Sequence, residues 1–91
     1  MDKENIIELK KKLTEISDIL YKGNVTQGIA DINNVIPDIA VLASWLPDDE
    51  SREELINNAL SPLLEAMEQG DPIATADIIV YELIAVMDKM I

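Results

Sequence analysis

The amino-acid sequence predicts an all-α fold, an antiparallel four-helix bundle made of two helical hairpins with an internal pseudo-repeat. Apolar residues recur at steps of three and four along four segments, which is the period of an amphipathic helix. The first stripe before a glycine consists of Leu9, Leu13, Ile16 and Leu20. A matching stripe, 47 positions later, consists of Ile56, Leu60, Leu63 and Met67. We therefore expect one helical domain over residues 1–91, with hairpins at 3–46 and 52–91 joined by an acidic linker at 47–51.

The first hairpin is predicted from a helix over residues 3–22 with a narrow apolar face. Gly23 can take the left-handed conformation that closes a helix, and Asn24 can cap the next one. Gly28 lies on the apolar arc of that second helix, where glycine costs about 1 kcal/mol relative to alanine. Its position predicts the close approach of another helix.

The second helix is predicted from Val25 to a residue between 44 and 46. Its apolar arc is wide enough to pack on two neighbours. Pro37 lies on the outer side of the helix, where the loss of one backbone hydrogen bond predicts a bend. A break of the helix at Ile36 is the alternative.

The third helix is predicted to begin after the linker. Ser51 and Glu54 match the S-x-x-E pattern of a capping box, in which each residue satisfies a backbone amide of the first turn. Pro62 lies further along the same helix, near the edge of its apolar side. A kink there, or a restart of the helix after Ser61, is expected.

The last helix follows the strongest local signal of the chain, Gly70-Asp71-Pro72. Glycine just beyond a helix, aspartate as the next N-cap and proline at the first helical position are typical of a tight turn between helices. The apolar arc of this last helix is broader than a surface helix needs. The helix is therefore either the most central element or a surface that meets another molecule.

The net charge of −11 is unevenly placed. Residues 1–22 hold five lysines and five acids, whereas residues 23–91 hold two cations and 13 acids. Such a surface repels the phosphates of nucleic acids and anionic lipids, because binding to either depends on lysine and arginine. No apolar run approaches the ~20 residues that a membrane span needs. We expect no nucleic-acid or membrane partner.

The composition also argues against catalysis and metal binding. The chain contains no histidine and no cysteine, so it lacks the commonest general base, the thiol nucleophile and the usual ligands of zinc. The acidic run 48–50 lacks the alternating ligands and central glycine of a calcium-binding loop. We expect no enzymatic activity, no catalytic residues, no metal site and no cofactor.

Partner binding is the remaining role, and a few residues stand out for it. Trp45, the only tryptophan, lies opposite the apolar arc of its helix; the alternative is that the linker folds back over it. Asp77 and Tyr81 lie one turn apart, where they can hydrogen-bond each other or a partner, or form a polar rim at a helix interface. The expected partner-binding residues are Trp45, Asp77, Ile78, Tyr81, Val86 and Met90.

The function expected from these features is that of a small acidic protein-interaction module, an adaptor or regulatory protein. It would self-associate as a homodimer or receive an amphipathic partner helix in a groove. A chaperone that shields a secreted or flagellar client is the alternative, and a bundle that encloses a small molecule is a further one. The first residues lack the basic-then-apolar pattern of a secretion signal, so a cytoplasmic location is expected.

One stretch of the chain resembles a known group of proteins. The motifs are Leu63-Leu64-Glu65-Ala66-Met67-Glu68-Gln69-Gly70-Asp71, Ala76-Asp77-Ile78 and Tyr81-Glu82-Leu83. These motifs resemble small uncharacterised all-helical cytoplasmic proteins of Gram-positive bacteria, mainly over residues 63–83. The resemblance implies a bacterial cytoplasmic protein and carries over no catalytic residue.

Overall fold

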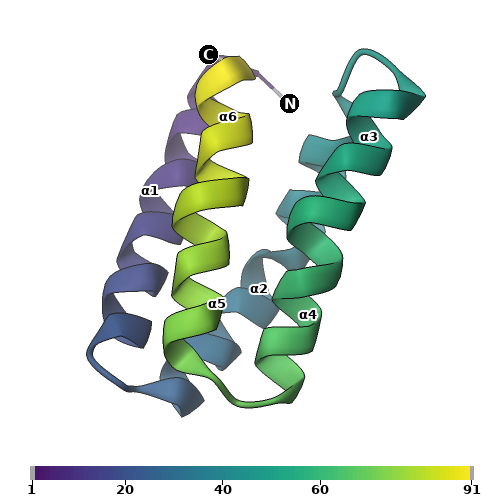
Figure 1. Cartoon of the computed structure of the whole chain (residues 1–91). Coiled ribbons are helices and arrows are strands. Elements are labelled where there is room, and N and C mark those ends of the chain that lie inside the picture. Colours follow the sequence, from purple (N-terminus) through teal and green to yellow (C-terminus); the bar gives the residue numbers. More distant parts are fainter. Residues whose placement is uncertain (1, 91) are drawn as a thin grey trace.

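The computed structural model describes residues 2–90, which form four antiparallel helical rods (Figure 1). The first two are α1 (Lys3–Tyr21) and α2 (Val25–Ser44). The third rod, residues 49–68, comprises α3 (Asp49–Leu55), the π-helical turn η1 (Ile56–Leu60) and α4 (Ser61–Glu68). The fourth rod, residues 72–90, comprises α5 (Pro72–Ile78), the π-helical turn η2 (Ile79–Leu83) and α6 (Ile84–Met90). The predicted all-α four-helix bundle is confirmed.

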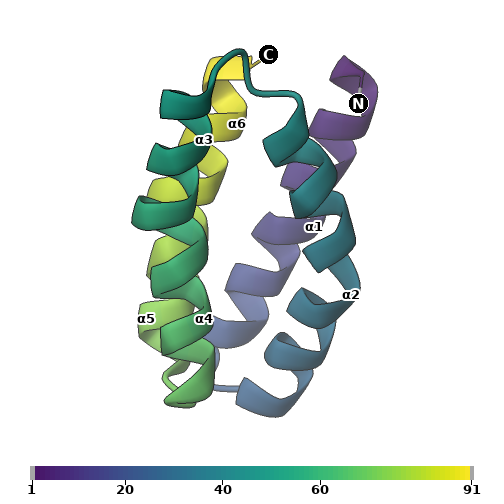
Figure 2. The ribbon, with the colours of Figure 1, turned by 90° about the vertical axis from the view of Figure 1, so that its right-hand side faces the viewer.

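The rods differ in how closely they pack. α1 packs along α2 on one side and along the whole fourth rod on the other, and the third rod packs against the fourth. α2 and the third rod meet chiefly where α2 ends and α3 begins. Figure 2 shows the two hairpins as two layers, with the linker crossing between them at the end where α3 starts. The seam between α2 and the third rod is the least closely packed of the four.

Short-range hydrogen bonds explain where the helices begin and end. The side chains of three N-cap residues accept a backbone N–H three residues ahead, which satisfies an amide of the first turn. These caps are Asp2, Asn24 and Asp71. Gly23 and Gly70 take φ angles of 85° and 66° at the two hairpin turns, a conformation that costs glycine nothing. The predicted turns of both hairpins are therefore confirmed.

The start of the third rod differs from the prediction. The N-cap is Asp48, whose carboxylate accepts the backbone N–H of Ser51 at 2.7 Å. Ser51 already lies in the first turn of α3, so the predicted Ser51–Glu54 capping box was wrong. Aspartate caps a helix as well as serine does. Starting at Asp48 also places Asp49 and Glu50 in the first turn, where the helix dipole favours negative charge.

Neither internal proline ends its rod. α2 runs through Pro37 without a break, so the expected alternative at Ile36 was wrong. Pro62 follows a wide turn in which the N–H of Ser61 donates to the carbonyl of Ile56, five residues back. A proline ring crowds the carbonyl four residues before it, and a wider turn relieves that contact. Regular α-helix then resumes at Ser61, which agrees with the predicted restart.

The core explains the broad apolar arc of the fourth rod. Ile79, Leu83 and Met87 are fully buried between α1 and the third rod. The neighbouring apolar residues of the same rod are partly buried and pack against this core, namely Ile78, Ile84, Val86 and Met90. Most of the apolar arc is thus used inside the bundle, although Ile73 at the start of the rod is 48% exposed.

The contact between α1 and α2 confirms the prediction for Gly28. A Cβ atom built on Gly28 would lie only 2.7 Å from Cγ of Leu20, which is itself fully buried. The absence of a side chain therefore lets the second helix approach the first beside Leu20.

Candidate functional site

A groove of about 400 Å³ lies between the third and fourth rods, close to the linker. We call it the linker-end groove. Its buried or partly buried apolar lining comprises Leu46, Leu55, Ala59, Ala85, Val86 and Met90. Its polar and exposed lining comprises Pro47, Ser51, Glu54, Asn58, Tyr81, Glu82 and Lys89. An apolar floor with a polar rim is the usual anatomy of a protein-binding surface.

The structure gathers four of the six expected partner-binding residues around this end of the bundle. Tyr81, Val86 and Met90 line the linker-end groove, and Tyr81 is 70% exposed. Trp45 lines a neighbouring hollow that shares Pro47, Lys89 and Met90 with the groove. At 57% exposure, Trp45 is not covered by the linker, so the alternative in which the linker folds over it was wrong.

The other two residues lie outside the groove. Asp77 is half-buried and accepts a hydrogen bond from the hydroxyl of Tyr21 on α1, at 2.6 Å. Asp77 therefore bonds across a helix interface, as the polar-rim alternative expected. The hydrogen bond to Asp77 raises the pKa of Tyr21 to about 12. Ile78 is partly buried and packs against the core.

A second surface was not predicted from the sequence. An apolar groove of about 130 Å³ lies between α2 and the third rod, lined by Ile36, Ile39, Ala40, Leu60, Leu63 and Leu64. Beside it, Ile56 is 45% exposed, and Leu64 itself is 55% exposed. We call this surface the apolar groove. It stays open because α2 and the third rod are the least closely packed neighbours.

One signal in the sequence could have indicated the apolar groove. The 20 residues of α2 contain only two charged side chains, Asp31 and Asp38. Both line hollows between α2 and α1, on the other side of the helix. In a chain with 18 acids, a helix side without any charged residue is unusual. This uncharged side of α2 lies opposite Asp31 and Asp38, and in the structure it borders the third rod.

Comparison with known proteins decides the family. Residues 3–91 match the model of a family described as a domain of unknown function, DUF8042. The chain belongs to this family. No curated protein and no solved structure matches it. The resemblance predicted from residues 63–83 is thereby confirmed in its coarser part, membership of a family without an assigned function.

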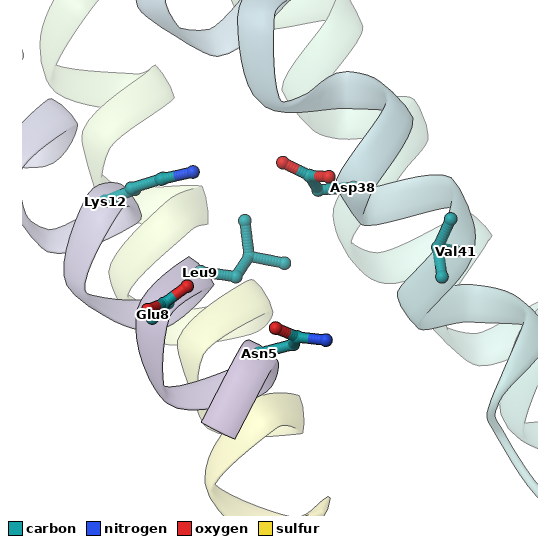
Figure 3. Close-up of a pocket in the computed structure, with 6 residues that line it drawn as sticks. All are labelled: Asn5, Glu8, Leu9, Lys12, Asp38 and Val41. Atoms are coloured by element: carbon teal, nitrogen blue, oxygen red, sulfur yellow. The ribbon is translucent and has the colours of Figure 1, made fainter. Parts of the chain in front are cut away.

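The hollow between α1 and α2 completes the surface of this DUF8042 chain (Figure 3). Its volume is about 400 Å³, and its lining residues are Asn5, Glu8, Leu9, Lys12, Asp38 and Val41. The side chains of Lys12 and Asp38 extend toward each other across it. Charges of both signs at an exposed seam indicate a solvated contact between helices.

Within residues 2–90, no group of three or more acidic, histidine or cysteine side chains is arranged to hold a metal ion. None of the helices in the same range combines the length and the apolar character required to cross a membrane.

Proposed function

We propose that this protein is a small acidic protein-interaction module without enzymatic activity, and that it binds a segment of another protein in the linker-end groove. The observation that carries the proposal is the gathering of Tyr81, Val86 and Met90 in one groove, with Trp45 in the adjoining hollow. Trp45 directly follows α2 and the other three belong to the fourth rod, and the fold brings them to one end of the bundle.

The aromatic side chains supply the anchors. Tryptophan and tyrosine dominate the energetics of many protein interfaces, because they bury a large area while freezing few rotamers. Trp45 and Tyr81 are both more than half exposed, so their contact area is available to a partner. Between them, Val86 and Met90 offer an apolar floor into which a partner side chain can insert.

The charges around the groove indicate the chemistry of the partner. Glu54 and Glu82 lie on its rim against the single cation Lys89, and the whole chain carries a net charge of −11. Electrostatic complementarity steers association and selects partners of opposite charge. The partner segment is therefore an amphipathic stretch with basic residues beside its apolar side chains.

The resemblance over residues 63–83 supports a bacterial cytoplasmic setting for this interaction. The experiment follows from that setting. A photo-crosslinking amino acid is placed in the native cell at position 81 or 45, and, as matched controls, at Ile7 or Ile73. Both control residues are 48% exposed and lie outside the groove. Positions 81 and 45 are expected to capture one and the same heterologous protein, and the controls none.

Binding of the captured protein is then measured with the purified chain, using the fluorescence of Trp45 as an internal reporter. Tyr81→Ala and Met90→Ala are each expected to weaken binding at least tenfold, about 1.4 kcal/mol, as truncation of an interface anchor does. Equal crosslinking at all four positions, or unchanged affinity of both variants, would contradict the proposal.

A further inference from the structure

A stripe of five residues runs along the third rod at steps of four, and two of its members, Leu60 and Leu64, line the apolar groove. Its members are Arg52, Ile56, Leu60, Leu64 and Glu68. We propose that this stripe is a self-association surface, on which a second copy of the chain binds antiparallel, with Leu60 at the twofold axis. This interface lies on a different seam from the linker-end groove, so it goes beyond the proposed function.

The apolar centre of the stripe is partly open to solvent. Ile56 and Leu64 are 45% and 55% exposed, whereas Leu60 between them is partly buried against the core. Ile36 and Ala40 of α2 line the apolar groove beside them. The stripe is thus a ridge next to a groove of matching chemistry, which is the arrangement that packed helices use.

The wide turn η1 brings the stripe into line. In an α-helix a step of four residues exceeds one turn of 3.6 residues, so such a row drifts around the helix. In η1 the N–H of Ser61 donates to the carbonyl of Ile56, five residues back. One turn therefore holds more residues than in an α-helix, and a step of four residues no longer exceeds one full turn. Ile56, Leu60 and Leu64 therefore remain on one side of the rod.

The ends of the stripe make it complementary to itself. In a twofold contact the same patch is used by both copies, so that residue i meets residue j and residue j meets residue i. Antiparallel pairing centred on Leu60 sets Ile56 against Leu64 of the second copy. The same register sets Arg52 against Glu68 of the second copy, and this ion pair forms twice.

The charge of the chain favours this face over others. Two copies that each carry a net charge of −11 repel each other, so a stable contact needs a face with few unpaired acids. The two charged residues of α2, Asp31 and Asp38, both line hollows toward α1. The side of α2 that faces the third rod therefore carries no charge. Arg52 is one of only two cations in residues 23–91.

The existing contact of Arg52 does not prevent the new one. Its Nη1 pairs with Asp49 at 3.0 Å, but the Asp49 side chain is 93% exposed, and such surface pairs contribute little. A guanidinium has five N–H donors in a fixed fork, so Arg52 retains donors for a carboxylate of the second copy.

Exchanging the charges of Arg52 and Glu68 tests the proposed antiparallel pairing, and sedimentation equilibrium of the full chain measures the dimer dissociation constant. The wild-type chain is expected to form dimers. Arg52→Glu and Glu68→Arg are each expected to raise the dimer dissociation constant about tenfold, because two exposed pairs change from attraction to repulsion. The double variant restores the wild-type value. Glu15→Arg on α1, with the same change in charge as Glu68→Arg, leaves it unchanged.

A second measurement uses the absence of cysteine from the chain. Leu60→Cys is expected to form a disulfide-linked dimer under mild oxidation, because the two thiols meet at the twofold axis. Ile73→Cys, at an exposed position of the fourth rod outside the stripe, is expected to form no disulfide-linked dimer. Circular dichroism verifies that each variant is folded.

The proposal is overturned if the wild-type chain is monomeric at all concentrations, or if the double charge variant dissociates as readily as the single ones. Crosslinking through position 73 rather than position 60 would also overturn it. These outcomes are independent of the linker-end groove, whose partner is a different protein. The oligomeric state and the captured partner therefore report on the two proposals separately.

Discussion

The hydroxyl of Tyr21 donates a hydrogen bond to Oδ1 of Asp77 at 2.6 Å and so ties the end of α1 to α5. Further along, Nζ of Lys10 lies 2.6 Å from Oδ1 of Asp88. The two contacts are spaced by the same 11 residues on α1 and on the fourth rod. Together they mark the antiparallel register in which the first hairpin packs on the second.

Removal of the Tyr21 hydroxyl should weaken this tie. Tyr21→Phe keeps the ring but loses the donor, so we expect a lower melting temperature by circular dichroism. Tyr81→Phe is the matched control, because the side chain of Tyr81 is 70% exposed and should not affect stability. Equal melting temperatures for the wild-type chain and Tyr21→Phe would show that this hydrogen bond contributes nothing in solution.

The same pair predicts a dependence of stability on alkaline pH. The pKa of Tyr21 is about 12 in the folded chain, against an ordinary value of 10.0, chiefly because its hydroxyl donates a hydrogen bond to Asp77. Because the pKa is higher in the folded chain, the protonated hydroxyl contributes its full stabilisation below pH 10. This stabilisation is lost as the pH rises from 10 to 12. Denaturant titrations should show the difference between the wild-type chain and Tyr21→Phe shrinking over this range. A constant difference would contradict the assignment.

The helix caps give a test of where the third rod begins. Asp48→Ala should lower the melting temperature, because it removes the acceptor of the Ser51 amide, while Asp48→Asn keeps an acceptor oxygen. Ser51→Ala should have a smaller effect, since alanine keeps the backbone N–H that donates to Asp48 at 2.7 Å. A larger loss for Ser51→Ala would favour the capping box that the sequence predicted.

Acid should weaken the same cap. The hydrogen bond from the backbone of Ser51 lowers the pKa of Asp48 from its ordinary 3.8. A lowered pKa stabilises the fold above the ordinary value, and the contribution is lost as the pH falls through the folded pKa. The stability difference between the wild-type chain and Asp48→Asn should therefore change below pH 3.8 and be constant above it. Acid denaturation of both proteins measures this.

The close contact between α1 and α2 should not tolerate a branched side chain. Gly28→Val should destabilise the fold by about 1–3 kcal/mol, because the new side chain overlaps Leu20. A domain of this size then loses about 4–8 °C of melting temperature per kcal/mol. The double variant with Leu20→Ala should lose less stability than the sum of the two single losses, because the smaller side chain at position 20 makes room for valine at position 28. Strict additivity would show that the side chains do not meet.

The helices and most of their ends could be predicted from the sequence because their determinants are local. Gly23, Gly70 and Asp71 each act on backbone groups within a few residues, and the structure uses all three as expected. The cap at Asp48 was missed because Asp48 and Ser51 are both good caps, three residues apart. Local preference ranks them almost equally, and the chain before the helix decides between them.

The candidate site was only partly predictable. Helical periodicity showed that Tyr81, Val86 and Met90 belong to one helix, but the groove also needs side chains from the third rod. The hydrogen bond of Asp77 to Tyr21 joins residues 56 positions apart. No pattern within one helix indicates such a pair, because it depends on which rods become neighbours.

The sequence by itself determined the four amphipathic helices, the turns between them and the distribution of charge, because each depends on residue type and spacing. Only the tertiary structure decided which apolar faces are covered. Periodicity shows that a face is apolar, but burial requires a second element that packs closely against it. The apolar face of the fourth rod is covered by α1 and the third rod. Leu64 and Ile56 stay exposed, because α2 and the third rod lie too loosely against each other to cover them.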